Sequence, residues 1–198
     1  SPDMLNLNEI KKLPGYSALF ILEPQYRNTR QFKNRLQLNR SELAKVEFIL
    51  NSMFWEQNCR ETGYETILRN HLEDLIILMS RQYSKIETHE ARALMRIGEV
   101  IEYLEQNYRS RIYLEEMAER ACMSKRHFHR TFKNATGESP IDYLIQIRLQ
   151  KGRELLRNTC LSVADVAYEV GFADVNHFIK KFKNHLQVTP HKYRMNFD

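Results

Sequence analysis

The apolar positions in the last third of the chain repeat one pattern twice. Each copy places an alanine in a short segment of helical spacing, then a break, and then two phenylalanines four residues apart. The alanines are Ala118 and Ala167, and the first phenylalanines are Phe128 and Phe178. The alanines lie 49 residues apart and the phenylalanines 50, so one residue is inserted after the second break. This spacing predicts the same pair of helices twice.

The break in each copy has the residues of a helix-turn-helix. The motif needs a small residue where the helices cross, and one helical turn later a residue that tolerates a left-handed backbone. The two alanines fill the first role, Gly171 fills the second, and Cys122 stands at the matching place in the first copy. Ser124 and Asp174 are the predicted N-caps of the second helices. We therefore predict helix-turn-helix units at about 112–136 and 161–186.

The remaining pattern predicts a mostly α protein with a small β part. One long helix from Pro140 to about 158 joins the two units, and another helix ends near Asn107. Upstream, two amphipathic patterns separated by Gly63 predict an αα-hairpin, with Ser41 as its first cap. Residues 16–22 and 32–38 are rich in apolar and aromatic residues, which is typical of strands. The predicted division is a β remnant at 1–40, a helical dimerisation or linker region at 41–90, and a domain with both helix-turn-helix units at 91–198.

Composition narrows the class of protein. The chain is 42% hydrophobic and 28% charged, as in ordinary globular proteins. No apolar run approaches membrane-spanning length, and the first residues lack the pattern of a signal peptide. Cys59, Cys122 and Cys160 lie beside apolar residues without metal spacing, and we expect them to be small core residues in a reducing cytoplasm. We expect a cytoplasmic protein without a membrane partner.

The charges indicate a nucleic-acid partner. The net charge is only +5, but basic residues gather on the second helix of each copy and acids on the first. Arginine suits guanine, asparagine suits adenine, and apolar side chains can meet a thymine methyl group. We assign base contacts to Arg126, His129 and Arg130 in the first copy, and to Val175, Asn176, Ile179 and Lys180 in the second. We assign phosphate contacts to Lys125, Lys133, Lys181 and Lys183.

The region from about residue 97 to 194 resembles the DNA-binding domain of the AraC/XylS family of bacterial transcription regulators. The residues that carry the resemblance are 118–132, 164–167, 170–172, Phe178, 182–183 and 189–194. The resemblance implies two helix-turn-helix subdomains joined by a central helix at about 140–157. It also implies that the two recognition helices enter adjacent major-groove segments about 34 Å apart. Val175 and Ile179 make the second reader less polar than in many relatives, which affects the base preference.

Residues 13–90 also resemble the segment after the cupin sensor barrel of effector-responsive members. Residues 14–20 are similar to the last strands of that barrel, and 42–56, 63–65 and 72–81 to its dimerisation helices. The resemblance implies a truncated regulator or a fragment. The expected partners are double-stranded DNA and a second copy of the chain bound through 41–83, with RNA polymerase as a further candidate. An effector is expected only if a full sensor domain exists upstream.

Other classes of function are disfavoured by the residues. The histidines near 127–129 and 177–191 lack cysteine or acidic partners at metal spacing, and no phosphate loop or activated nucleophile is recognisable. We therefore expect no enzyme activity, metal or cofactor. The alternative is a helical protein-interaction module with degenerate DNA-binding units. The hairpin itself has two interpretations, self-association or cover for the β part.

Overall fold

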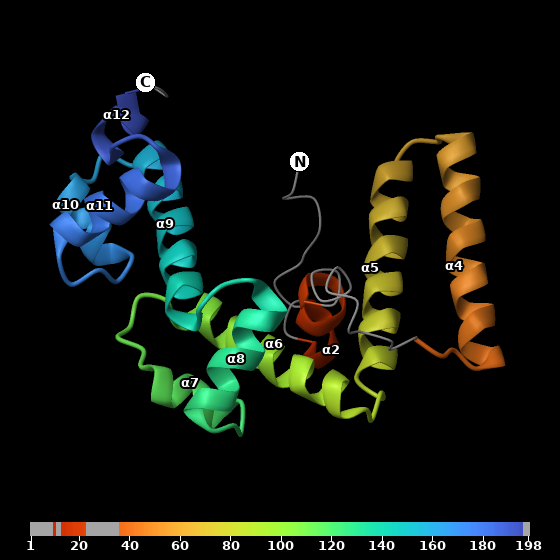
Figure 1. The fold of residues 1–198 in the computed structure, drawn as a ribbon. Helices are drawn as coiled ribbons and strands as arrows, with labels where there is room; N and C mark the ends of the chain where they lie inside the picture. Colours follow the sequence, from red (N-terminus) through yellow and green to blue (C-terminus); the bar gives the residue numbers. More distant parts are fainter. Residues whose placement is uncertain (1–9, 11–12, 23–35, 196–198) are drawn as a thin grey trace. The chain divides into compact units, whose positions relative to one another are not determined.

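The computed structural model describes residues 10, 13–22 and 36–195, and it contains no strand within them (Figure 1). The chain divides into two compact units, Ser1–Glu102 and Tyr103–Asp198. Helix α6 (His89–Asn107) contains the point of division. The mostly helical fold class is confirmed. The three-part division at residues 40 and 90 remains a prediction.

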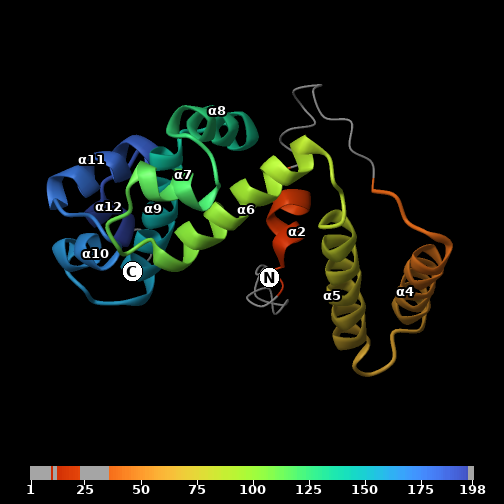
Figure 2. The same cartoon turned by 90° about the horizontal axis from the view of Figure 1, so that it is seen from below.

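The first unit contains a helical hairpin. Helices α4 (Arg40–Cys59) and α5 (Tyr64–Tyr83) lie side by side and run in opposite directions (Figures 1 and 2). Gly63 precedes α5 with a φ of +92°, a left-handed conformation that glycine adopts readily. The predicted break between the two helices is therefore confirmed.

The predicted strand at residues 16–22 is wrong. This segment forms the helical turn α2 (Pro14–Tyr16) and the π-helix η2 (Ser17–Leu22), and α2 packs against α5. A short apolar run does not distinguish a strand from a buried helix, and Ala18 and Leu22 are fully buried here. The other predicted strand, 32–38, lies largely outside the described residues, and 36–38 do not form a strand.

Two local expectations also need correction. The cap of α4 is Asn39 rather than Ser41, because its Oδ1 accepts from the Glu42 amide at 2.9 Å while Glu42 accepts from the Asn39 amide. This reciprocal pair satisfies two free amides at once.

The three cysteines are exposed rather than in the core. Cys59 ends α4 and Cys122 occupies a turn, so apolar neighbours in sequence did not indicate which way these side chains face.

The second unit contains the two predicted pairs of helices around a long central helix. The first pair is α7 (Leu114–Arg120) and α8 (Lys125–Thr136), and the second is α10 (Val163–Glu169) and α11 (Val175–Leu186). The central helix α9 (Pro140–Asn158) starts at the predicted proline, and α12 (Pro190–Met195) packs against it. This arrangement confirms the two helix-turn-helix subdomains.

Candidate nucleic-acid interface

The first helix-turn-helix has the predicted turn. Cys122 adopts a left-handed backbone with φ +51°, and Ala118 is almost completely buried. The Ser124 side chain accepts a hydrogen bond from the His127 amide at 3.4 Å and caps α8. α8 ends at Thr136, and its C-cap Gly137 is also left-handed. A cysteine therefore fills the position for which glycine is the usual choice.

The second helix-turn-helix repeats this geometry with stronger caps. Gly171 has φ +89° and Ala167 is fully buried. Ser162 and Asp165 form a reciprocal capping box at the start of α10. The Asp174 carboxylate accepts from the Asn176 and His177 amides at 3.0 and 3.2 Å, and so caps α11.

Matching aromatic contacts hold the two recognition helices, α8 and α11. Phe128 and Phe132 are fully buried with ring centroids 5.5 Å apart, as are Phe178 and Phe182. Phe132 meets Tyr143 edge to face at 5.5 Å, and Phe182 meets Tyr193 in the same way at 5.5 Å. The inward phenylalanines are therefore as predicted. Because they occupy the inner face, the opposite face of each helix is left for solvent or a partner.

The residues assigned to base contacts differ in exposure. Arg126, His129 and Arg130 are exposed on α8, and Asn176 and Lys180 are exposed on α11. Val175 and Ile179 are half-buried and pack against the aromatic core of the second helix-turn-helix. The two apolar side chains thus contribute to that core whether or not they meet a base.

Two of the four lysines assigned to phosphate contacts are ion-paired. Lys125 pairs with Glu115, and Lys181 lies 3.5 Å from Oδ1 of Asp142 on α9. The Lys125 hydrogen bond is also the main reason that the pKa of Glu115 is lowered. Lys133 and Lys183 are exposed.

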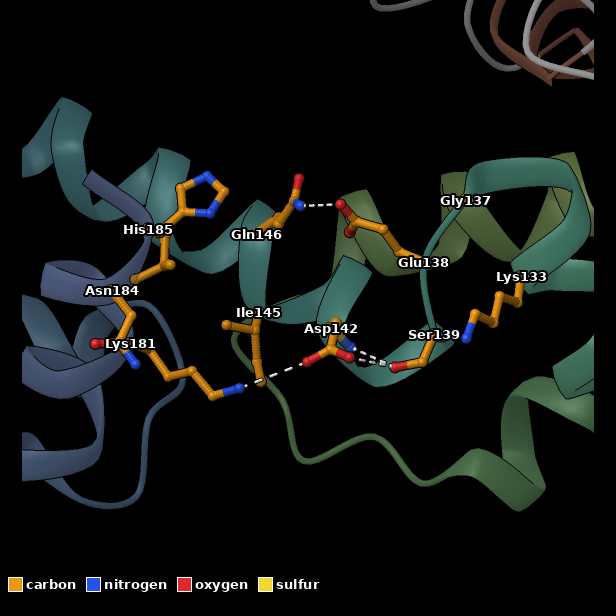
Figure 3. A pocket seen from close by; sticks show the side chains of 11 residues that line it. Lys133, Gly137, Glu138, Ser139, Asp142, Ile145, Gln146, Lys181, Asn184 and His185 are labelled. Carbon is orange, nitrogen blue, oxygen red and sulfur yellow. Dashed lines mark hydrogen bonds and ion pairs between the residues drawn. The ribbon is translucent and has the colours of Figure 1, made fainter. Parts of the chain in front are cut away.

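Lys181 lines a cleft of about 450 Å³ that lies between α8 and α11, over the start of α9 (Figure 3). We call it the inter-helix cleft, and its polar lining includes Lys133, Glu138, Asp142, Gln146, Lys181 and His185. Glu138 accepts a hydrogen bond from Gln146, and its second carboxylate oxygen, Oε2, is buried without a hydrogen bond. Lys133 and Lys181 enter the cleft from different recognition helices, so one cavity contains cations of both.

Arg148 ties the central helix to the segment that follows α6. Its Nε donates to the Tyr108 carbonyl at 2.7 Å, and its Nη2 donates to the Ser110 carbonyl at 2.8 Å. A Cβ on Gly171 would lie 2.7 Å from the carbonyl oxygens of Tyr108 and Arg109, so the second turn packs directly against this segment. Burial lowers the pKa of Arg148. The segment that leads into the first helix-turn-helix is therefore in contact with both the central helix and the second turn.

Arg148 and Asp142 are functional candidates that the sequence pattern did not indicate. A signal for Arg148 exists, because it lies four residues from Leu144 and four from Gly152, which are both buried on α9. A charged residue on a buried helical face requires local partners. Asp142 carries no comparable signal, since an acid in the first turn of a helix is common.

Among the described residues, no group of three or more histidine, cysteine or acidic side chains could hold a metal ion. Within the same ranges, no helix is both long and apolar enough to cross a bilayer.

Comparison with known proteins agrees with this geometry. The profile of a helix-turn-helix domain family matches residues 117–196. The HTH-type transcriptional activator RhaS of Escherichia coli O139:H28 (strain E24377A / ETEC) is 29% identical over 168 residues, 85% of this chain and 60% of RhaS. The DNA-binding domain of AdpA, a global transcriptional factor, was solved in complex with a target DNA. It is 30% identical, with a TM-score of 0.50, covering 52% of this chain and 92% of that one.

A transcriptional regulator from Chromobacterium violaceum, described as AraC-type, is 27% identical, with a TM-score of 0.49, over 52% of this chain and 91% of its own. The chain belongs to the AraC-type family of helix-turn-helix transcription regulators, as the shared sequence of the DNA-binding domain shows. It spans 60% of the length of the RhaS relative.

Proposed function

We propose that this protein is a sequence-specific regulator that inserts α8 and α11 into adjacent major-groove segments of a promoter site. The observation that carries the proposal is the repeated framework of turn, cap and paired phenylalanines beneath two exposed helix faces. A framework conserved between the copies, with different residues on the outer faces, suits one reader of an asymmetric site.

We assign base contacts and phosphate contacts to different exposed side chains of α8 and α11. Arg126, His129 and Arg130 on α8, together with Asn176 and Lys180 on α11, contact base edges. Lys125, Lys133, Lys181 and Lys183 contact phosphates, which position the protein without reading sequence. Val175 and Ile179 serve first as packing residues, and any thymine contact comes from their exposed parts.

Binding to duplex DNA at increasing salt tests this function, because each neutralised phosphate releases counterions. Affinity that is indifferent to salt between low and physiological levels would favour the rival interaction module. Two variants separate the roles. Arg130→Ala is expected to relax preference at one base pair, whereas Lys183→Ala is expected to weaken binding to all sequences alike. Equal losses on every sequence for Arg130→Ala would exclude a base contact.

We also propose that the protein dimerises through α4 and α5. On α4, Phe48, Phe54 and Trp55 are 69%, 72% and 68% exposed, whereas Ile49 is buried. Exposed aromatic side chains at this density are typical of an interface, because each offers about 150–250 Å² for burial. A second copy of the same hairpin supplies a matching apolar face.

Sedimentation equilibrium tests the dimer. Phe48→Glu with Phe54→Glu is expected to give a monomer, while Gln150→Glu on the exposed surface of α9, outside the hairpin, leaves the dimer intact. A wild-type monomer at high concentration would contradict the proposal. RNA polymerase as a partner and a cytoplasmic location follow from the regulatory role, and an effector requires a sensor domain beyond this chain.

A further inference from the structure

Asp142 lies between predicted phosphate-binding lysines of the two recognition helices. Its Oδ1 lies 3.5 Å from Nζ of Lys181 on α11, and Lys133 of α8 lines the same inter-helix cleft (Figure 3). The carboxylate is held in place independently of either lysine. Oδ2 accepts from the Ser139 hydroxyl at 2.7 Å, and the Asp142 amide donates back to that hydroxyl at 3.2 Å. Ser139, then the lysines, lower the pKa of Asp142, so it carries its charge at neutral pH.

The two partners of the ion pair differ in mobility. Asp142 is fixed in the first turn of α9 by its own N-cap, whereas Lys181 reaches it on a flexible four-carbon stem. The Asp142 side chain is 58% exposed and the Lys181 side chain 36%, so water screens the ion pair. A DNA phosphate can therefore replace the carboxylate as the partner of Lys181. Lys181 can therefore leave Asp142 without any change in the fold.

The proposed function places DNA phosphates at this cleft. Two recognition helices in adjacent major-groove segments have the intervening sugar-phosphate backbone between them. The cleft lies between α8 and α11 and contains a lysine from each. The inference rests on that proposed function. If DNA binds there, the negative charge of Asp142 faces the negative charge of the DNA backbone.

We propose that Asp142 is an internal phosphate mimic that occupies Lys181 until DNA displaces it, and thereby weakens binding to DNA of every sequence. Displacement exchanges one anion for another on Lys181 and leaves a fixed carboxylate beside the backbone. The cost falls on all sequences alike because it concerns phosphates rather than bases. A regulator that binds weakly to DNA of arbitrary sequence depends more on its base contacts for affinity. Asp142 therefore increases discrimination between DNA sequences at the expense of total affinity.

Asp142→Asn tests the proposal, because the amide keeps an acceptor for Ser139 and removes the charge. Glu154→Gln is the matched control, since it removes one exposed acid from the same helix, where Glu154 pairs with Lys151 at 3.0 Å. Binding of the full chain to a random-sequence duplex of about 30 base pairs, long enough for both groove segments, is measured across a salt series. Thermal unfolding and circular dichroism confirm that each variant is folded.

The expected result for Asp142→Asn is tighter binding at low salt, with a log–log salt slope steeper by about 0.9, because no freed carboxylate takes up a cation to offset one released from the DNA. Its advantage over wild type then shrinks about 3.5-fold between about 50 and 200 mM salt. Glu154→Gln should bind like wild type. In a Lys181→Gln background, Asp142→Asn should no longer change the slope.

Three outcomes would overturn the proposal. Unchanged or weaker binding by folded Asp142→Asn would make the ion pair a structural link between the recognition helices. Equal gains for Asp142→Asn and Glu154→Gln would indicate a general effect of net charge. A slope change that persists without Lys181 would assign the effect elsewhere. Wild-type protein that fails to bind duplex DNA contradicts the proposed function instead, so the two failures are distinguishable.

Discussion

Replacing Gly171 by alanine tests how closely the second turn packs against the segment after α6. Gly171 has φ +89°, and a left-handed alanine costs about 1 kcal/mol. The added Cβ would also lie 2.7 Å from the carbonyl oxygens of both Tyr108 and Arg109, a separation that requires backbone to move. Overpacking of this kind typically costs about 1–3 kcal/mol. We expect Gly171→Ala to lose about 2–4 kcal/mol of unfolding free energy.

Gly137 provides the matched control. It has φ +81°, so alanine pays a similar conformational cost, but an added Cβ meets no atom within 4 Å. We therefore expect Gly137→Ala to lose about 1 kcal/mol. The difference between the two variants measures the steric contact alone.

Hydrogen exchange of the α10 and α11 amides is the suitable assay, because it reports the stability around the second turn separately from that of residues 1–102. A difference of about 2 kcal/mol corresponds to roughly 30-fold faster exchange in Gly171→Ala than in Gly137→Ala. Equal protection of these amides in both variants would show that the turn does not pack against Tyr108 and Arg109, and would refute the proposed link.

Three further predictions concern the second unit. Arg148→Met should lose about 3 kcal/mol in urea unfolding, because two carbonyl acceptors lose a charged donor, whereas Arg153→Met should lose under about 1 kcal/mol. Similar losses for the two variants would count against the link between Arg148 and the segment after α6. Burial, then Glu105 and Glu138, raises the pKa of Tyr143 to about 12 from 10, so the folded protein holds this proton more tightly than the unfolded chain. The resulting stability is present below pH 10 and is lost as the pH rises toward 12; Tyr143→Phe should reduce that loss, and an unchanged alkaline profile would speak against it. Asp174→Ala removes the cap of α11 and should lower the free energy of unfolding by about 1 kcal/mol, measured by thermal unfolding. An unchanged free energy of unfolding would contradict the role of Asp174 as a cap.

The helix-turn-helix units could be predicted from sequence because their determinants are local. A small residue at Ala118 or Ala167, a left-handed position one turn later, and a capping side chain all lie within a few residues of each other. The repeat added a second test of each assignment. Cysteine by itself does not indicate a left-handed position, and Gly171 at the matching place in the other copy supplies the indication for Cys122.

Features that depend on distant partners were missed or mistaken. The apolar run at 16–22 was assigned to a strand, but a helix buries the same residues against α5. Asp142 and Arg148 acquire their roles from residues 38 to 40 positions away, which no local pattern reports. The half-burial of Val175 and Ile179 likewise follows from the packing of the second core rather than from their place on the helix.

Selection of bound sites from random duplexes tests the central claim most directly. We predict two preferred blocks of unlike sequence with centres about 10 base pairs apart, one for each recognition helix. Arg130→Ala should relax preference at one base pair within one block, and Asn176→Ala at one base pair within the other. A single block, or two variants that alter the same block, would contradict two readers on one site.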